Sequence, residues 1–230
     1  MSDVLRPSRL RMQSAMNQAL LNMLGRPVED LGPVRAPAKA GGSKHQRVII
    51  RLEFRGIEPK IWRRFSVPGD LQARDLVKVV RKVAGWPGAH MDAVHFPRPA
   101  PSVQRPLLVA ERLQSGDGFR YTYDFGSPWT HDLVVESVEV VSSADHRVVL
   151  IAGERACPPD DCGGAAGYAE LCQALAKKRP SRLVRWVKEV SPNFEPEAFD
   201  VGARNSRSLS HLSLRFGIPA KARRRKTGTV

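Results

Sequence analysis

The residues best suited to chemistry lie in two short runs. In the first, Asp124 ends a predicted strand and His131 begins the next, so the two side chains could approach each other across a turn. A carboxylate that orients an imidazole is the basis of general acid–base chemistry. His90 is a third candidate, and three nitrogen and oxygen donors could also hold a metal. The structural alternative is that Asp124 caps the turn and His131 is a hydrogen-bonded strand histidine.

The second run contains Cys157 and Cys162 with Asp160 and Asp161 between them. Thiolates beside carboxylates can bind a soft metal, so Cys157, Asp161 and Cys162 are candidate ligands. The C-x4-C spacing is looser than the usual zinc spacing and no second cysteine pair follows. A rigid turn that leads into a helix is therefore the competing interpretation, and a disulfide is not expected in a reducing cell.

A third group of side chains suits nucleic acid. Trp62 and Arg64 share one face of a predicted strand, whereas Arg63 faces the other way. A base could stack on Trp62 beside the Arg64 guanidinium, as in single-stranded or loop recognition. The alternative is a cation–π pair that holds the surface of the sheet together.

Net charge points to the same class of partner. The chain carries a net charge of +14, of which residues 201–230 carry +8 and residues 46–200 only +2. A nucleic acid, with DNA the first expectation, would therefore be contacted mainly through the basic ends. The alternative is a tail that only aids solubility. The densest cluster is formed by Lys221, Arg223, Arg224, Arg225 and Lys226.

The composition and the absence of common catalytic motifs argue against several classes of protein. No stretch approaches the roughly 20 apolar residues that span a bilayer, so no membrane partner is expected. Three cysteines and no signal peptide indicate a cytoplasmic protein. The G-x-S-x-G, H-E-x-x-H, Walker A and G-x-G-x-x-G motifs are all absent from the sequence, which argues against a common enzyme class and predicts no cofactor.

The elements that must position these residues follow from hydrophobic periodicity. Apolar residues alternate over 48–54 and again over 61–67, with turn residues between, which predicts a β-hairpin. Asp70 is the expected N-cap of a helix with an i, i+3, i+4, i+7 apolar stripe. Gly85 is expected to end that helix. Strand, strand, helix is the opening of a β-grasp-like layout.

Further strands are expected over 119–124, 131–141 and 148–151, and two helices over 167–176 and 181–190 that pack back onto the sheet. The fold class is therefore α+β, with an antiparallel, β-grasp-like sheet, helices packed on one face, and basic N- and C-terminal extensions.

Three regions are expected along the chain. Residues 1–45 contain a candidate helix over 10–24 and a flexible Gly/Pro-rich linker. That helix could dock a protein partner or a second copy of the chain. Residues 46–200 form the folded domain, and residues 201–230 a basic tail that is disordered unless a polyanion binds it.

Several motifs together resemble a known family. They are Ile57-Glu-Pro-Lys-Ile-Trp-Arg-Arg, Gly85-Trp86 with His90, Tyr123-Asp-Phe-Gly with Trp129 and His131, Ala156-Cys-Pro-Pro-Asp-Asp-Cys-Gly-Gly with Gly167-Tyr168, and Asn193-Phe-Glu-Pro-Glu-Ala-Phe-Asp. In this order they resemble the plasmid pRiA4b open-reading-frame-three-like family over residues 46–200. The resemblance implies a bacterial or archaeal α+β domain carried on plasmids or transposable elements, with no secure biochemical activity.

Two positions depart from the family pattern. The family shows His-Leu-His after Gly-Trp, where this chain has His90-Met91-Asp92. The acidic pair between Phe-Gly and Trp is replaced by Ser127-Pro128. If those positions form a metal or catalytic site in relatives, this chain has lost part of it.

The leading hypothesis from the sequence is a non-enzymatic accessory protein of plasmid or transposable-element origin that contacts DNA through basic tails. The first alternative is a metal-dependent or acid–base enzyme with a His/Asp/Cys cleft. The second is a protein–protein interaction module.

Overall fold

The computed structural model describes residues 45–217, and all of them belong to one unit of the chain. Its centre is a six-stranded sheet with the order β3-β4-β5-β1-β2-β6, in which each neighbouring pair is antiparallel. The predicted α+β class is confirmed. The strands are β1 (His45–Phe54), β2 (Trp62–Pro68), β3 (Asp92–His95), β4 (Gly118–Tyr123), β5 (Trp129–Val141) and β6 (Val149–Glu154).

The β1–β2 hairpin forms where the alternation predicts it. Val48, Ile50 and Leu52 are buried, and β1 pairs with β2 on one side and along most of its length with β5 on the other. Trp62 and Arg64 have the same parity in β2, whereas Arg63 is fully buried on the opposite face. Because side chains alternate along a strand, one face of the sheet becomes core and the other carries mostly polar residues.

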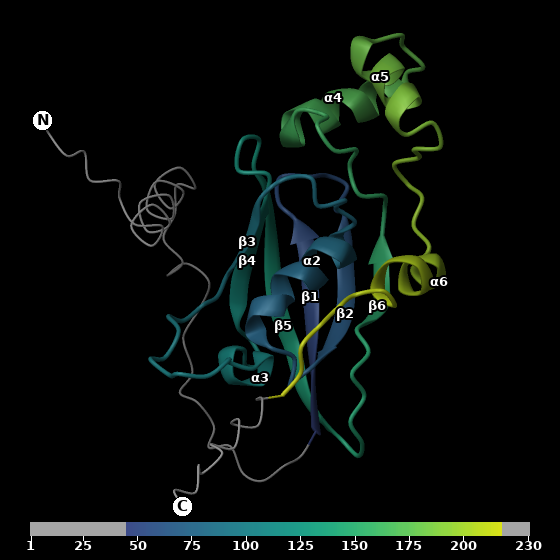
Figure 1. The fold of residues 1–230 in the computed structure, drawn as a ribbon. Coiled ribbons are helices and arrows are strands. Elements are labelled where there is room, and N and C mark those ends of the chain that lie inside the picture. Colours follow the sequence, from purple (N-terminus) through teal and green to yellow (C-terminus); the bar gives the residue numbers. More distant parts are fainter. Residues whose placement is uncertain (1–44, 218–230) are drawn as a thin grey trace, which may run out of the picture. The chain divides into compact units, whose positions relative to one another are not determined.

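Helix α2 (Leu76–Ala84) covers the core face of the sheet (Figure 1). Its predicted apolar stripe is buried, and it ends at Gly85, whose φ of 117° favours glycine. Its start differs from the prediction, because a short 3-10 turn, η2 (Ala73–Asp75), precedes it. Asp70 does not cap the helix and instead pairs with His146.

The remaining helical elements range from 4 to 13 residues in length. They are α3 (Val109–Arg112), α4 (Gly164–Ala176), α5 (Arg182–Val190), α6 (Val201–Arg204) and the π-helical turn η3 (Asn205–Leu209). Figure 1 shows α4 and α5 beyond one end of the sheet, the end at which β6 leads into α4. No helix within residues 45–217 is long and apolar enough to cross a membrane.

Residues 201–217 pack against the domain, which corrects the predicted start of the tail at residue 201. The Arg215 side chain donates two hydrogen bonds, both of 2.9 Å, to the buried Asp75 carboxylate. These bonds hold the pKa of Asp75 at about 2, below its usual value. Leu209 is buried, and Phe216 bridges to Leu71. The expected helix over 10–24 and the basic cluster at residues 221–226 lie outside the described residues.

Candidate functional site

Carboxylates approach the His90 ring from both sides. His90 Nδ1 lies 3.8 Å from Asp124 Oδ1, and His90 Nε2 lies 3.6 Å from Asp160 Oδ1 and 3.1 Å from Asp161 Oδ1. These residues come from three segments far apart in the sequence: the loop between α2 and β3, the end of β4, and the loop between β6 and α4. We call these four residues the His90 cluster.

The backbone at two of the aspartates is left-handed. Asp124 has φ of 57° and Asp161 has φ of 62°, a region that is uncommon for residues with a side chain and best tolerated by Asp and Asn. The Gly126 N–H donates to Asp124 Oδ1 at 3.0 Å, which fixes the turn after β4. Such conformations persist where the surroundings impose them, and they are common at binding sites.

Tyr123 links the His90 cluster to the core. Its hydroxyl donates to Asp160 Oδ2 at 3.0 Å, and its ring stacks on Trp86 with centroids 4.6 Å apart. Burial, followed by the neighbouring Asp160 carboxylate, raises the pKa of Tyr123 to about 12. The hydroxyl therefore stays protonated and orients Asp160 as a hydrogen-bond donor.

Two polar atoms of the cluster are buried without a hydrogen-bond partner, His90 Nε2 and Asp160 Oδ1. Buried polar atoms in folded proteins are usually hydrogen-bonded, so each exception requires an explanation. Within residues 45–217, no Lys or Arg side chain forms an ion pair with Asp124, Asp160 or Asp161. The cluster thus concentrates negative charge, and His90 Nε2 makes no aligned hydrogen bond although Asp161 Oδ1 lies 3.1 Å away.

The spacing of these atoms suits a cation. One ligand atom each from His90, Asp124 and Asp161 can be chosen so that all lie within 4.8 Å of one another. Atoms that each bind one ion at about 2.1 Å are separated by about 3 Å in neighbouring positions and by at most about 4.2 Å in opposite ones. Small movements of the side chains would therefore bring all three onto a single ion.

His131 lies outside this cluster, although the sequence grouped it with His90 and Asp124. Its ring is fully buried and makes an edge contact with Phe54 at a centroid distance of 4.3 Å. Trp86 Nε1 donates to His131 Nε2 at 3.0 Å, and Nδ1 faces the Tyr121 carbonyl at 3.2 Å. Burial lowers the pKa of His131 to about 3, so the ring stays neutral in the core.

Of the three candidate metal ligands in the second run, Cys157, Asp161 and Cys162, only Asp161 lies in the His90 cluster. Asp161 belongs to the His90 cluster, and its side chain is 69% exposed. Cys162 is buried and Cys157 is partly buried, and burial raises the pKa of both thiols to about 12. Neither thiol belongs to the group of ligand atoms that converge at His90, Asp124 and Asp161. Asp160 is not among the ligands predicted from the sequence, although its position next to Asp161 indicates it.

The departures from the family pattern also have structural counterparts. Asp92, in place of a second histidine, accepts two hydrogen bonds from Arg81 at 2.6 and 2.7 Å and one from Tyr121 at 2.7 Å. It is fully engaged and lies outside the cluster. The carboxylates that face His90 come instead from Asp124 and from the Asp160-Asp161 pair.

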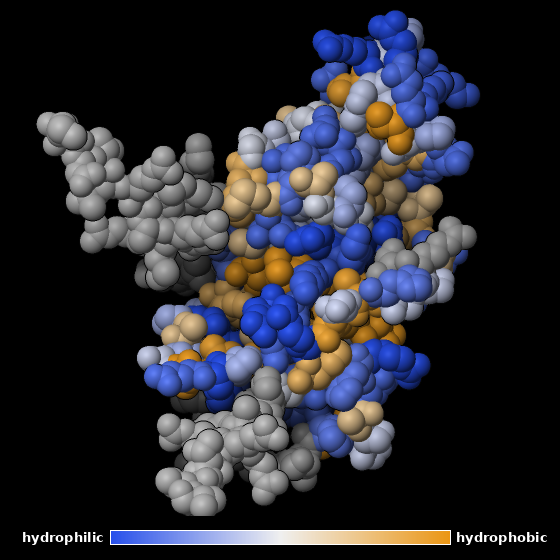
Figure 2. Space-filling view, in the orientation of Figure 1, coloured by the Kyte–Doolittle hydropathy of each residue, from blue (hydrophilic) through white to orange (hydrophobic). Residues whose placement is uncertain are grey.

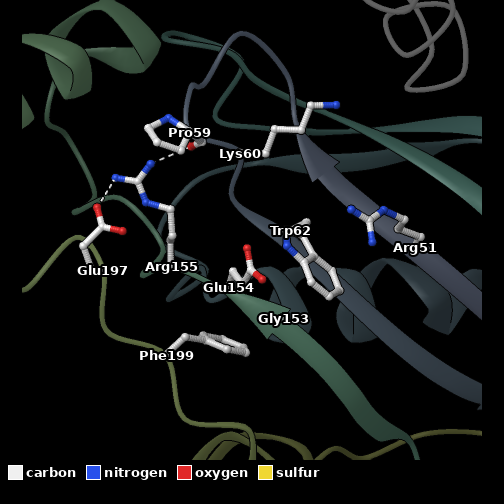
Figure 3. Close-up of a pocket in the computed structure, with 9 residues that line it drawn as sticks. All are labelled: Arg51, Pro59, Lys60, Trp62, Gly153, Glu154, Arg155, Glu197 and Phe199. Carbon is white, nitrogen blue, oxygen red and sulfur yellow. Dashed lines mark hydrogen bonds and ion pairs between the residues drawn. The ribbon is translucent and has the colours of Figure 1, made fainter.

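The proposed nucleic-acid strand has a different setting. Trp62 lines a cavity of about 440 Å³ together with Phe199 and Arg155. The Arg155 side chain donates hydrogen bonds to the Pro59 carbonyl and to the Glu197 carboxylate (Figure 3). The Arg51 guanidinium lies 4.2 Å from the centroid of the Trp62 ring. Arg64 is not part of the cavity and pairs with Glu136 at 2.5 Å. Trp62 is therefore in the cation–π pair that the alternative interpretation described, with Arg51 as its partner.

Comparisons with known proteins agree on the family. A protein of Sinorhizobium fredii named "Uncharacterized protein y4hQ" is 26% identical over 196 residues, which cover 78% of this chain and 97% of that protein. A protein of unknown function from Methanosarcina mazei, MM3350, has a crystal structure that matches with a TM-score of 0.60 at 24% identity, over 70% of this chain and 98% of that one. The second match supports the fold alone. The profile of the plasmid pRiA4b ORF-3-like proteins matches residues 46–203, more than half of the sequence, so the chain belongs to that family.

Proposed function

We propose that this domain binds one divalent cation in the His90 cluster. The observation that carries the proposal is the convergence of His90, Asp124 and Asp161 from three distant segments, with a ligand atom of each within 4.8 Å of the others. The unpartnered Nε2 of His90 and Oδ1 of Asp160 give independent support, because a cation would satisfy both. The ion would then offset two of the three negative charges of the carboxylates.

The donor set favours a first-row cation such as Mn²⁺, which accepts both imidazole and carboxylate ligands. Asp124 is only 14% exposed but Asp161 is 69% exposed, so one side of the ion would face solvent. A cation that keeps open positions can hold water or an anionic ligand and lower the pKa of that water. The Tyr123 hydroxyl would orient Asp160 beside the ion.

The test is a titration of the full chain with Mn²⁺ after treatment with EDTA, following the electron paramagnetic resonance signal of the free ion. We expect one bound ion per chain. The double substitution Asp124→Asn and Asp161→Asn should weaken binding at least about tenfold, because losing even an outer-shell partner of a ligand costs about that much. Asn tolerates the left-handed backbone at both positions, so the fold is preserved while the charge is removed.

Asp132→Asn is the matched control, because Asp132 is a surface carboxylate paired with Arg120 at 3.4 Å, outside the cluster. It should leave Mn²⁺ affinity unchanged. Failure of the wild-type chain to take up Mn²⁺ or Zn²⁺ at millimolar concentration would refute the cation site. Equal losses in the control and in the double variant would also refute it.

The net charge of +14 favours a second function, DNA contact by an accessory protein of a plasmid or transposable element. The sequence assigns this contact to the basic ends, including residues 221–226, with Trp62 and Arg64 as further candidates. Replacing the five basic residues of 221–226 by Gln in the full chain should weaken duplex binding and flatten its salt dependence. Wild-type binding that does not respond to salt would argue against this function.

A further inference from the structure

Six cations lie close together in sequence at the connection between α4 and α5. Lys177, Lys178 and Arg179 follow the last residue of α4, and the α5 side chains Arg182, Arg185 and Lys188 continue the series. We call these six residues the α4–α5 basic surface. All six are exposed. Figure 2 shows strongly hydrophilic side chains gathered at the end of the domain where Figure 1 places these helices.

These cations are unpaired, unlike most arginines elsewhere in the domain. None of the six forms an ion pair with a described carboxylate. By contrast, Arg51, Arg64 and Arg105 each pair with a glutamate at 2.5 to 2.8 Å. Only two acidic residues, Glu170 and Glu189, occur within α4 and α5. The surface therefore carries uncompensated positive charge.

The positions on α5 place this charge on one side of the helix. Arg182, Arg185 and Lys188 recur every three residues and span about 9 Å along the axis. Val184 and Val187 are buried on the opposite side. Because the helix uses its apolar side for packing, its cationic side is left free for a ligand.

The fold gains little from these charges. Cations after the end of α4 offset its dipole, which is worth roughly 0.3–1 kcal/mol for an exposed charge. Arg182, however, is the first residue of α5, where the dipole disfavours a cation, and the first turn of α5 has no acidic residue. A cation kept at an unfavourable position, without a carboxylate partner, points to an external anion.

We propose that the α4–α5 basic surface contacts the phosphate backbone of duplex DNA; this inference rests on the second function proposed above. The surface contributes mainly cations, since Leu183 and Trp186 are partly buried against the core and Val190 is the large apolar side chain of α5 that is mostly exposed. A membrane-binding helix would instead expose large apolar residues on its free side. Closely spaced cations that release counterions suit the regular phosphates of a duplex.

The experiment measures fluorescence anisotropy of a labelled duplex of about two helical turns with the full chain, between about 50 and 200 mM salt. The variant Arg182→Gln, Arg185→Gln, Lys188→Gln removes three charges from α5. We expect its affinity to fall at least about tenfold, and its log–log salt slope to drop by up to about 3, close to one for each lost phosphate contact.

The matched control, Lys60→Gln, Arg105→Gln, Arg147→Gln, changes the net charge by the same amount at exposed sites outside α4 and α5. Its affinity should change by less than about threefold, because these three cations are already paired with carboxylates and contribute mainly to the long-range field. A second variant, Lys177→Gln, Lys178→Gln, Arg179→Gln, tests the same surface without touching α5, in case the first variant fails to fold.

The possible results distinguish failure of the α4–α5 proposal from failure of the DNA-contact proposal. If the wild-type chain binds duplex and both α4–α5 variants bind as the control does, the inference is wrong while DNA contact stands. If the wild-type chain binds anionic vesicles or polyglutamate but no duplex, both proposals fail. Selective loss in the α4–α5 variants supports both.

Discussion

His90 and His131 lie in two neighbouring regions and show what opposite surroundings do to the same side chain. His131 is fully buried among aromatic rings, and both ring nitrogens face hydrogen-bonding groups of the protein. His90 is partly exposed, faces three carboxylates and has a buried Nε2 without a hydrogen-bond partner. Trp86 and Tyr123 connect the two, because Trp86 donates to His131 and stacks on Tyr123. The first region stabilises the fold, and the second is available for a ligand.

The largest expected effect is on stability at His131. His131→Ala should lower the free energy of unfolding by about 4 kcal/mol, because it leaves a cavity and an unpaired Trp86 N–H. His90→Ala should cost less than about 1 kcal/mol, as expected for a partly exposed side chain. Urea unfolding of both variants measures the difference. Equal losses would contradict the division into a core region and a ligand region.

The next effect is a pH dependence that His131 dominates. Its pKa is about 3 in the folded state, against the usual 6.5, so the folded state favours the neutral ring. Stability is then complete above pH 6.5 and is lost as the pH falls below it, by about 2–3 kcal/mol at pH 4.5. Burial also lowers the pKa of His95, which adds in the same direction.

The variant His131→Gln should remove most of this slope between pH 6.5 and 4.5, when unfolding is followed at several pH values. The contribution of Asp75 does not overlap that window, because its pKa is lowered from 3.8 to about 2 and its stabilisation is lost only below pH 4. A slope that persists in the glutamine variant would show that other groups control acid stability.

The variant Tyr123→Phe tests the residue that connects the core region to the His90 cluster. The phenylalanine ring can still stack on Trp86, but Asp160 loses the hydrogen bond that orients it. We expect a loss of about 1 kcal/mol in stability and a several-fold weaker affinity for Mn²⁺. An unchanged affinity would mean that Asp160 takes no part in cation binding.

The smallest expected effect is a gain in stability. Asp124→Asn together with Asp161→Asn should raise the stability of the metal-free chain by about 0.5 kcal/mol, because it removes repulsion between neighbouring carboxylates. The asparagine oxygen can still accept from the Gly126 N–H. Thermal unfolding in EDTA, compared with Asp132→Asn, measures the gain. A clear loss of stability would assign these aspartates to the fold.

Local patterns were enough to predict most elements. The alternation in β1 and β2 and the apolar stripe of α2 were confirmed because each buries one face. Ser181 caps α5 as such a residue should, with its side chain accepting from the Val184 N–H at 3.1 Å. Strand β3 was not predicted, since four residues are too few to show a period. The start of α2 and the packing of residues 201–217 depend on contacts between distant segments, such as that of Arg215 with Asp75.

Sequence alone determined the period of the strands, the apolar face of α2, the family motifs and the presence of aspartate and histidine in the right segments. Only the tertiary structure decided that His90 meets Asp124, Asp160 and Asp161 while His131 turns into the core. The reason is geometric: strand parity decides only which face of the sheet a side chain occupies, whereas the residues that meet His90 are 34 or more positions away from it along the chain.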